Sequence, residues 1–183
     1  MENLQQDYSL FHRFIDSYLP SGFLGIDRND PLIIKLENMM ERNNQFFYIA
    51  DAIHIKILFT SNRSAEMIGV EPNELSVYHF MDITHPDDLQ RLNIGRAIVI
   101  KKAQDIFIAK KGSAFLSANF KMRNAKGKYS NVLTQNYLFY SSIPYSTVFF
   151  FKVHTNIDWS KKIKHGYHYY IGNDMSFFKY PTE

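Results

Sequence analysis

The chain has 183 residues, of which 45% are hydrophobic and 21% are charged, and its net charge is +3. These values fit one folded domain with extensions, and they exclude disordered, collagen-like and low-complexity chains. The sequence has no cysteine, which excludes disulfide scaffolds, thiolate metal sites, cysteine nucleophiles and cofactors attached through a thiol.

Two predicted helices precede any strand. Residues 2–19 carry large side chains at alternating steps of four and three, at Leu4, Tyr8, Phe11, Ile15 and Tyr18. Pro20 and Gly22 end this helix, and a second helix begins at Asp30 and ends in the polar stretch 42–44. We therefore predict an N-terminal helical extension over residues 1–45.

The first helix also has a second apolar face, formed by Leu10, Phe14 and Leu19. One face can cover the domain while the other meets a second copy of the chain, and most oligomers are symmetric in this way. This reasoning predicts a homodimer whose interface contains Leu4, Tyr8, Phe11, Ile15 and Tyr18. In the alternative, both faces pack within one chain. A weaker alternative uses Ile94 and Ile98 on the longest helix as the interface.

The pattern after residue 45 predicts an antiparallel sheet. Residues 46–60 have the short apolar runs of a hairpin, residues 62–84 hold short segments only, and a longer helix runs from about 86 to 103. Three strands follow, at 114–123, 129–140 and 145–156. The fold class is therefore α+β, with a five-stranded antiparallel sheet and helices on one face.

Three spaced motifs in this region resemble a PAS sensor domain. They are the run from Ser61 to Val70, then Glu74-Leu75, then the run from Asp82 to Asp88. Lys111-Gly112, Gly127-Lys128-Tyr129 and Asn156-Ile157-Asp158 are similar to the remaining landmarks, the last with Asn156 and Asp158 where the family has Asp and Thr. The resemblance implies a PAS-like sensor domain over residues 46–158.

The flanks are similar to the N-terminal sensory region of LuxR-type transcriptional regulators from Bacteroides-like bacteria. The features that carry this resemblance are the helical extension and the tail from Tyr169 to Asp174, ending near Tyr180-Pro181. The resemblance implies that residues 159–183 connect to an effector, a helix-turn-helix domain, that this chain does not contain. DNA is then a partner only through that effector.

A cytoplasmic location is expected, without a membrane as partner. The first residues are acidic and polar, unlike a signal peptide. Residues 129–151 carry no charge, but they include Pro144 and several polar residues, so we interpret them as two strands and a turn.

No residue is predicted to be catalytic and none to bind a metal. His85 and Asp87 are explained by the start of the helix at Pro86, and His165 and His168 lack further ligands nearby. The sequence has no phosphate-binding glycine loop and no hydrolase motif, so we expect no enzyme activity. The basic, aromatic tail 161–170 has the residue types of a nucleic-acid contact, but we favour a strand that packs its tyrosines on the helical extension.

The resemblance implies a ligand cavity between the apolar face of the sheet and the helices. The residues expected to contact a ligand there are Met67, Phe80, Ala118, Phe120 and Tyr137. No cofactor is predicted: a covalently attached flavin or chromophore needs a cysteine, and the family holds haem through a histidine on the longest helix, where residues 86–103 have none.

Three functions remain open at this point. The first is a sensor that binds a small molecule and passes a conformational change to an effector. The second is a PAS module that mediates dimerisation without a ligand, in which the predicted cavity is a filled core. The third is an enzyme that uses the same cavity.

Overall fold

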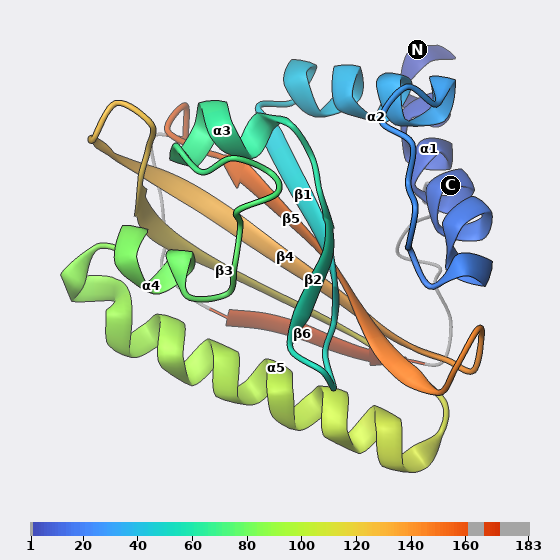
Figure 1. Cartoon of the computed structure of the whole chain (residues 1–183). Helices are drawn as coiled ribbons and strands as arrows, with labels where there is room; N and C mark the ends of the chain where they lie inside the picture. The colour runs from blue at the N-terminus through green and yellow to red at the C-terminus, as the bar shows by residue number, and fades with distance from the viewer. Residues whose placement is uncertain (1, 161–166, 173–183) are drawn as a thin grey trace.

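The structure is a computed structural model, and it describes residues 2–160 and 167–172. Figure 1 shows the elements, which are α1 (Glu2–Tyr18), α2 (Pro31–Arg42), β1 (Gln45–Asp51), β2 (Lys56–Thr60), α3 (Arg63–Ile68), α4 (His79–Ile83), α5 (Leu89–Ala109), β3 (Ser113–Arg123), β4 (Tyr129–Ser141), β5 (Thr147–Asn156) and β6 (Tyr167–Gly172). Short 3-10 turns occupy Leu19–Ser21 and Pro86–Asp88.

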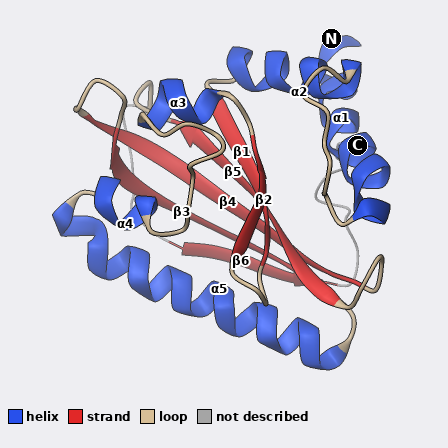
Figure 2. Cartoon of the chain, in the orientation of Figure 1, coloured by secondary structure: helices blue, strands red, loops and turns tan. Residues whose placement is uncertain are grey.

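The strands form one antiparallel sheet in the order β2-β1-β5-β4-β3-β6. The first five are the strands predicted from the sequence, and the helices α3, α4 and α5 connect β2 to β3 across one face (Figure 2). The predicted fold class is confirmed. The sixth strand, β6, comes from the tail and pairs with β3 over the register Ser113↔Gly172 to Ala118↔Tyr167. A strand in the tail was predicted, whereas the packing of its tyrosines lies outside the described side chains.

The sheet separates two layers of helices, as Figure 1 shows. On one face, α1 and α2 pack on alternate residues of β1 and β5, among them Phe47, Ile49, Phe149 and Phe151. On the other face, the intervening residues of the same strands, together with β3 and β4, pack against α3, α4 and α5. Because a strand presents successive side chains to opposite faces, β1 and β5 belong to both hydrophobic cores.

The longest helix begins where the sequence predicts a helix start, but it extends further. Asp87 donates its backbone N–H to Nδ1 of His85 at 3.2 Å, so His85 caps the turn at Pro86–Asp88 that precedes α5. The helix continues to Ala109, six residues beyond the predicted end at 103. Ile106 is buried against the sheet, and this contact accounts for the additional turns.

Two glycines stand at turns where φ is positive, Gly69 at +73° and Gly127 at +76°. Gly69 ends α3, and Gly127 closes the turn between β3 and β4, where its N–H donates to the carbonyl oxygen of Asn124. Glycine adopts this backbone conformation without the steric cost that a side chain adds.

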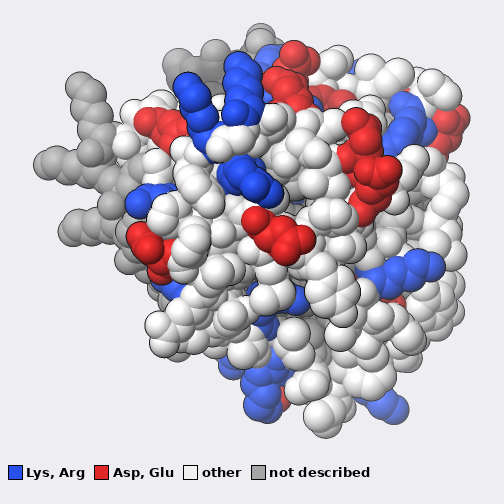
Figure 3. Space-filling model, turned by 60° about the vertical axis from the view of Figure 1, so that its left-hand side comes forward, with Lys and Arg blue, Asp and Glu red and all other residues white. Residues whose placement is uncertain are grey.

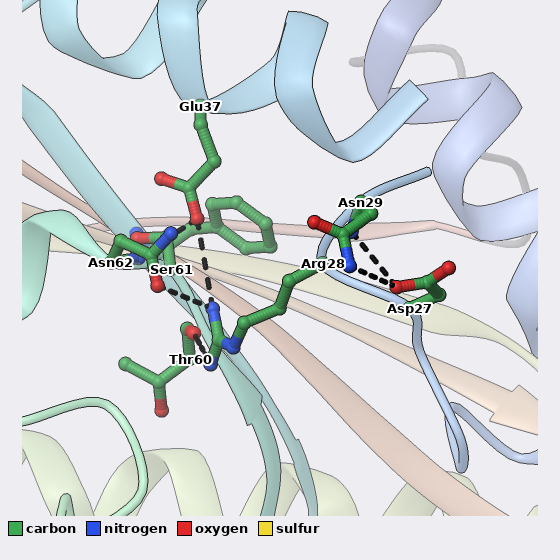
Figure 4. A network of polar contacts seen from close by, with 8 residues as sticks. Asp27, Arg28, Asn29, Glu37, Thr60, Ser61 and Asn62 are labelled. Atoms are coloured by element: carbon green, nitrogen blue, oxygen red, sulfur yellow. Dashed lines mark hydrogen bonds and ion pairs between the residues drawn. The ribbon is translucent and has the colours of Figure 1, made fainter. Parts of the chain in front are cut away.

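A polar network, drawn in Figure 4, ties the linker between α1 and α2 to the end of β2. The Arg28 guanidinium donates to the backbone oxygen of Thr60 at 2.8 Å and to Oδ1 of Asn62 at 2.7 Å. It also lies over the ring of Phe59, 4.8 Å from the centroid. The Glu37 carboxylate accepts from the backbone N–H of Asn62 at 2.8 Å. The helical extension is therefore held to the sheet by polar contacts as well as by its apolar face.

Candidate functional site

A cavity of about 90 Å³ lies between the inner face of the sheet and α5. Its wall is mostly apolar and includes Phe80, Val99, Ala118, Phe120 and Phe150. Ile55, Val77 and Ile100 also line it; the side chains of Ile55 and Ile100 are exposed, so the cavity reaches the surface beside the β1–β2 turn and α5. The site has the composition of a small-molecule pocket, with apolar walls and a few polar groups.

The structure brings three of the five predicted ligand contacts together on this wall, namely Phe80, Ala118 and Phe120. Met67 packs against the same hydrophobic cluster but does not line the cavity. Tyr137 packs on the opposite face of the sheet, near Phe151 and α1, and so does not reach the cavity. Its neighbours Thr134 and Asn136 line the cavity instead, because alternate residues of β4 face opposite sides.

Two cations face this apolar space. Lys152, on β5, is half-buried, and its ammonium lies over the rings of Tyr48 at 5.4 Å, Phe80 at 5.9 Å and Phe150 at 5.9 Å. Arg96 reaches the cavity from α5. Of the residues that the structure describes, none forms an ion pair or hydrogen bond with either side chain.

Burial and the charge of Arg96 lower the pKa of Lys152 to about 7. Burial penalises the charged form of a lysine, and a second cation nearby acts in the same direction. The ring contacts favour the ammonium but supply no counter-ion. Lys152 is therefore the group of this site that changes charge near neutral pH.

One carboxylate also borders the cavity, that of Asp51, but it is already occupied. It accepts hydrogen bonds from the backbone N–H groups of Ile53 and His54 and from the hydroxyl of Thr147, all at 2.9 Å, and it contacts the His54 ring. Burial by itself would raise the pKa of Asp51, but these hydrogen bonds outweigh it and leave the pKa below its ordinary value. Asp51 holds the β1–β2 turn and is not the counter-ion of Lys152.

Two buried polar atoms beside the cavity have no hydrogen-bond partner among the described residues, Oδ1 of Asn136 and Nε2 of His154. The Asn136 amide donates to the carbonyl oxygen of Leu116 at 3.1 Å, and Nδ1 of His154 lies 3.0 Å from the Thr134 hydroxyl. Burial and the nearby Lys152 lower the pKa of His154 well below its ordinary value, so its ring is neutral. Buried polar atoms normally have partners, so these two atoms can form hydrogen bonds with a polar group in the cavity.

The polar residues of the site, above all Lys152 and Arg96, were missed by the sequence analysis. Lys152 stands between Phe151 and Val153 in a strand whose residues are apolar on both faces, and a lysine at such a position normally indicates the solvent side. The alternation Phe150, Lys152, His154 against Phe149, Phe151, Val153 is the signal that places them on one face.

Three of the five predicted dimer residues pack against the hydrophobic core of their own chain. Ile15 is 6% exposed, and Phe11 and Tyr18 are half-buried against the same cluster. The Phe11 and Phe151 rings meet edge to face at 4.9 Å, and the Tyr18 hydroxyl donates to the Asp30 carboxylate. Leu10 and Phe14 are buried too, so the described part of α1 follows the alternative in which both faces pack within one chain. Leu4 and Tyr8 belong to α1, but their side chains lie outside the described ones.

The weaker alternative concerns α5. Ile94 is exposed there, whereas Ile98 packs in part against the hydrophobic cluster.

The face of the molecule drawn in Figure 3 carries Lys and Arg side chains interspersed with Asp and Glu, without a broad surface of one sign. That face lacks the electrostatic footprint of a nucleic-acid binder.

Within the described ranges, no group of three or more His, Asp or Glu side chains is placed to hold a metal ion. The helices described there include none that is long and apolar enough to cross a membrane. Of the histidines considered as ligands, His165 lies outside the described residues, and His168 is on β6, where side chains are not described.

No family model matches the chain, and no curated protein matches it. Among solved structures, the chain is similar to wild-type Drosophila melanogaster Cycle PAS-B with bound ethylene glycol, at 14% identity and a TM-score of 0.43 over 61% of this chain and 99% of that one. It is also similar to the N-terminal domain of a diguanylate cyclase with PAS/PAC sensor from Marinobacter aquaeolei, at 9% identity and a TM-score of 0.45 over 63% and 96%.

A third similar structure is an RNA-binding Light-Oxygen-Voltage receptor, at 17% identity and a TM-score of 0.42 over 63% of this chain and 28% of that one.

The fold of this chain is defined by the strand order β2-β1-β5-β4-β3, with three helices on one face of the sheet. The fold of the domain is PAS-like. The LuxR-type resemblance of the flanks has no counterpart among these structures.

Proposed function

We propose that this chain is a sensory module in which a small molecule occupies the cavity between the sheet and α5, and that it acts without catalysis. The observation that carries the proposal is the cavity itself, which holds two cations and two buried polar atoms without partners inside an otherwise apolar core. A PAS module that serves only dimerisation needs a filled core at this place, and it gains nothing from polar groups buried there.

Strand β5 offers a direct route from the cavity to the helical extension. Phe150, Lys152 and His154 face the cavity, while Phe149, Phe151 and Val153 pack under α1 and α2. A ligand that displaces Lys152 changes the position of a strand on which α1 rests. Transmission of a signal requires that the ligand bind with different affinity to two conformations of the protein. Strand β5 is the element that joins the cavity to the helical extension in both conformations.

We further propose that the effector is the DNA-binding part of a LuxR-like bacterial transcriptional regulator in the cytoplasm, and that this protein acts as a homodimer. The resemblance of the extension and of the tail supports this context. The dimer then uses a surface other than the face of α1 that contains Phe11 and Ile15. The exposed apolar residues Ile94 and Ile108 of α5 are candidates for that surface.

Mass spectrometry of the protein after gentle purification tests the proposal. The native protein is expected to carry a small molecule that is released on denaturation and that stabilises the apo protein when added back. A native mass equal to that of the bare chain, together with no stabilisation by a broad set of small molecules, would show that the cavity serves packing alone.

A further inference from the structure

The cavity contains an excess of positive charge that its own residues do not balance. Lys152 enters from β5 and Arg96 from α5, and the carboxylate in the cavity wall, that of Asp51, is held by His54, Ile53 and Thr147. We propose that the cavity binds a compact organic carboxylate, with its anionic group between Lys152 and Arg96 and its apolar body toward Ala118 and Phe120. This inference rests on the proposed function and specifies the chemical class of the ligand.

The first step concerns charge. A cation taken out of water costs free energy unless a counter-ion or hydrogen bonds compensate it. Lys152 has aromatic rings around its ammonium and no described acceptor, and Arg96 has no described carboxylate partner. A carboxylate suits both cations, since the guanidinium of an arginine binds its two oxygens side by side and a lysine ammonium donates to either one.

The second step concerns the rest of the ligand. Apart from these cations, the wall is formed by side chains such as Phe80, Val99, Ala118 and Phe120. An apolar cavity of 150 Å³ in another protein holds benzene. The 90 Å³ found here therefore takes a body smaller than benzene, or a single ring that extends toward the open side of the cavity at Ile55 and Ile100. This excludes nucleotides and dinucleotide cofactors unless the cavity opens, and it favours short aliphatic or single-ring acids.

The third step concerns hydrogen bonding. Nε2 of His154 and Oδ1 of Asn136 are buried next to the same cavity without partners. The neutral His154 ring can donate from Nε2 if Nδ1 accepts from Thr134, and this would place one more donor on the same side as Lys152. The groups that lack partners here are thus mainly donors, as expected for a site that receives an anion.

Matched pairs of acids and amides test the inference on the complete chain: benzoate with benzamide, phenylacetate with phenylacetamide, and hexanoate with hexanamide. Within a pair the body is the same and only the charge differs. At least one acid is expected to bind ten-fold or more tightly than its amide by calorimetry. Lys152→Met is expected to remove this preference while amide binding persists, and Arg96→Met is expected to reduce it.

Lys101→Met serves as the control, because Lys101 lies on the exposed side of α5 and pairs with Asp105. It should leave the preference for acids unchanged. Melting curves of the three variants establish that each one is folded.

The failures of the two proposals can be told apart. Amides that bind as tightly as their acids would overturn the carboxylate and leave a sensor of neutral molecules. Acids that fail to bind at millimolar concentration would also overturn the carboxylate. In that case, a neutral compound released from the purified protein would still support the proposed sensory function. A protein purified without any bound compound, and stabilised by none, would contradict the proposed function as well. Equal acid preference in Lys152→Met and the native chain would place the anion elsewhere.

Discussion

Lys152 and Phe151 are neighbours on β5, and they point to opposite faces of the sheet. Lys152 lies over the rings of Tyr48 and Phe80 in the cavity, while the ring of Phe151 meets that of Phe11 on α1 at 4.9 Å. A shift of this strand on one face therefore changes the packing on the other. Two adjacent residues thus connect the candidate ligand site to the N-terminal helices.

The titration of Lys152 gives the stability of the protein a specific pH dependence. Its pKa is about 7 in the folded chain and near 10.5 when unfolded, so between these values the unfolded state binds more protons. Stability is therefore expected to rise with pH across this window, with a slope of at most about 1.4 kcal/mol per pH unit. Denaturant unfolding at pH 7 to 10 measures it, and Lys152→Met should flatten the profile.

Other charged groups around the cavity are Arg96 on α5, Asp51 on β1 and His154 on β5. The neutral, buried His154 acts in a different window, because its pKa is lowered and stability is lost as the pH falls below about 6.5. A profile above pH 7 that is the same in Lys152→Met and in the native chain would contradict the assignment of this step to Lys152.

Ala118→Phe is expected to fill the cavity and to abolish the binding of a small molecule while the fold is retained. Ala118 is 4% exposed and lies on the cavity wall. The additional ring occupies the free volume, with an overpacking cost of about 1–3 kcal/mol. Calorimetry and a melting curve give the two results. Val99→Phe fills the same space from α5, so unchanged affinity in both folded variants would place the ligand elsewhere.

The double variant Phe11→Glu, Ile15→Glu is expected to lose stability rather than to yield a well-folded monomer. Both side chains pack on the sheet. A glutamate at either position would bury a charge that has no counter-ion, which lowers the stability of the folded state. We expect a loss above about 2 kcal/mol in denaturant unfolding. Ser17→Glu, at an exposed position of the same helix, is the control. A double variant that melts like the native chain but has half its mass in solution would support the predicted dimer interface on α1 instead.

Arg28→Ala is expected to loosen the helical extension and to leave the cavity intact. It removes charge-assisted hydrogen bonds to Thr60 and Asn62, which contribute about 1.5–3 kcal/mol each when well buried and less at this partly exposed site. Hydrogen exchange should accelerate in α2 and in the linker, with little change in α5. Lys35→Ala, on the exposed side of α2, should have no such effect. Equal exchange in Arg28→Ala and the native chain would mean that apolar packing alone holds the extension.

Gly127→Val is expected to lower stability by about 1 kcal/mol or more, because a β-branched residue is strained at a positive φ. A Cβ at Gly127 meets no atom within 4 Å, so the effect reports the backbone and not a clash. Lys126→Val, in the same turn, has no such φ and is the control. A Gly127→Val protein with the native melting temperature would contradict the role of this turn.

The strands and helices of the sheet region were predictable because their signals are local. Alternation in 114–123 and the proline and two acidic residues at 86–88 place β3 and the start of α5 within three residues. The faces of β4 and β5 were less predictable, since Leu133, Tyr137 and Phe139 are as apolar as Val132 and Leu138 on the other side. For this reason the sequence pattern does not show that Tyr137 faces away from the cavity and that Lys152 faces into it.

The two apolar faces of α1 posed a similar problem. A helix with apolar residues on both sides fits a dimer interface or a groove within its own chain, and the helical period distinguishes neither. The decision depends on how α2 and the linker at Arg28 arrange themselves around it, which is a matter of tertiary contacts. Phe14 is fully buried and its ring contacts that of Phe151. These two residues are far apart in the sequence, so a local pattern cannot predict their contact.

The pairing of β6 with β3 has a consequence for self-association. Without β6, residues 113–118 of β3 would present a row of free backbone donors and acceptors, which is the kind of edge that recruits strands from other molecules. In the part of the chain that the structure describes, β6 and β2 are the two outermost strands of the sheet. The β2 edge has five residues and an irregular register opposite Ile49 and Ala50, and it begins with Lys56. β6 thus shortens the outermost strand on that side from the eleven residues of β3 to its own six, which leaves a smaller edge for a strand of another molecule.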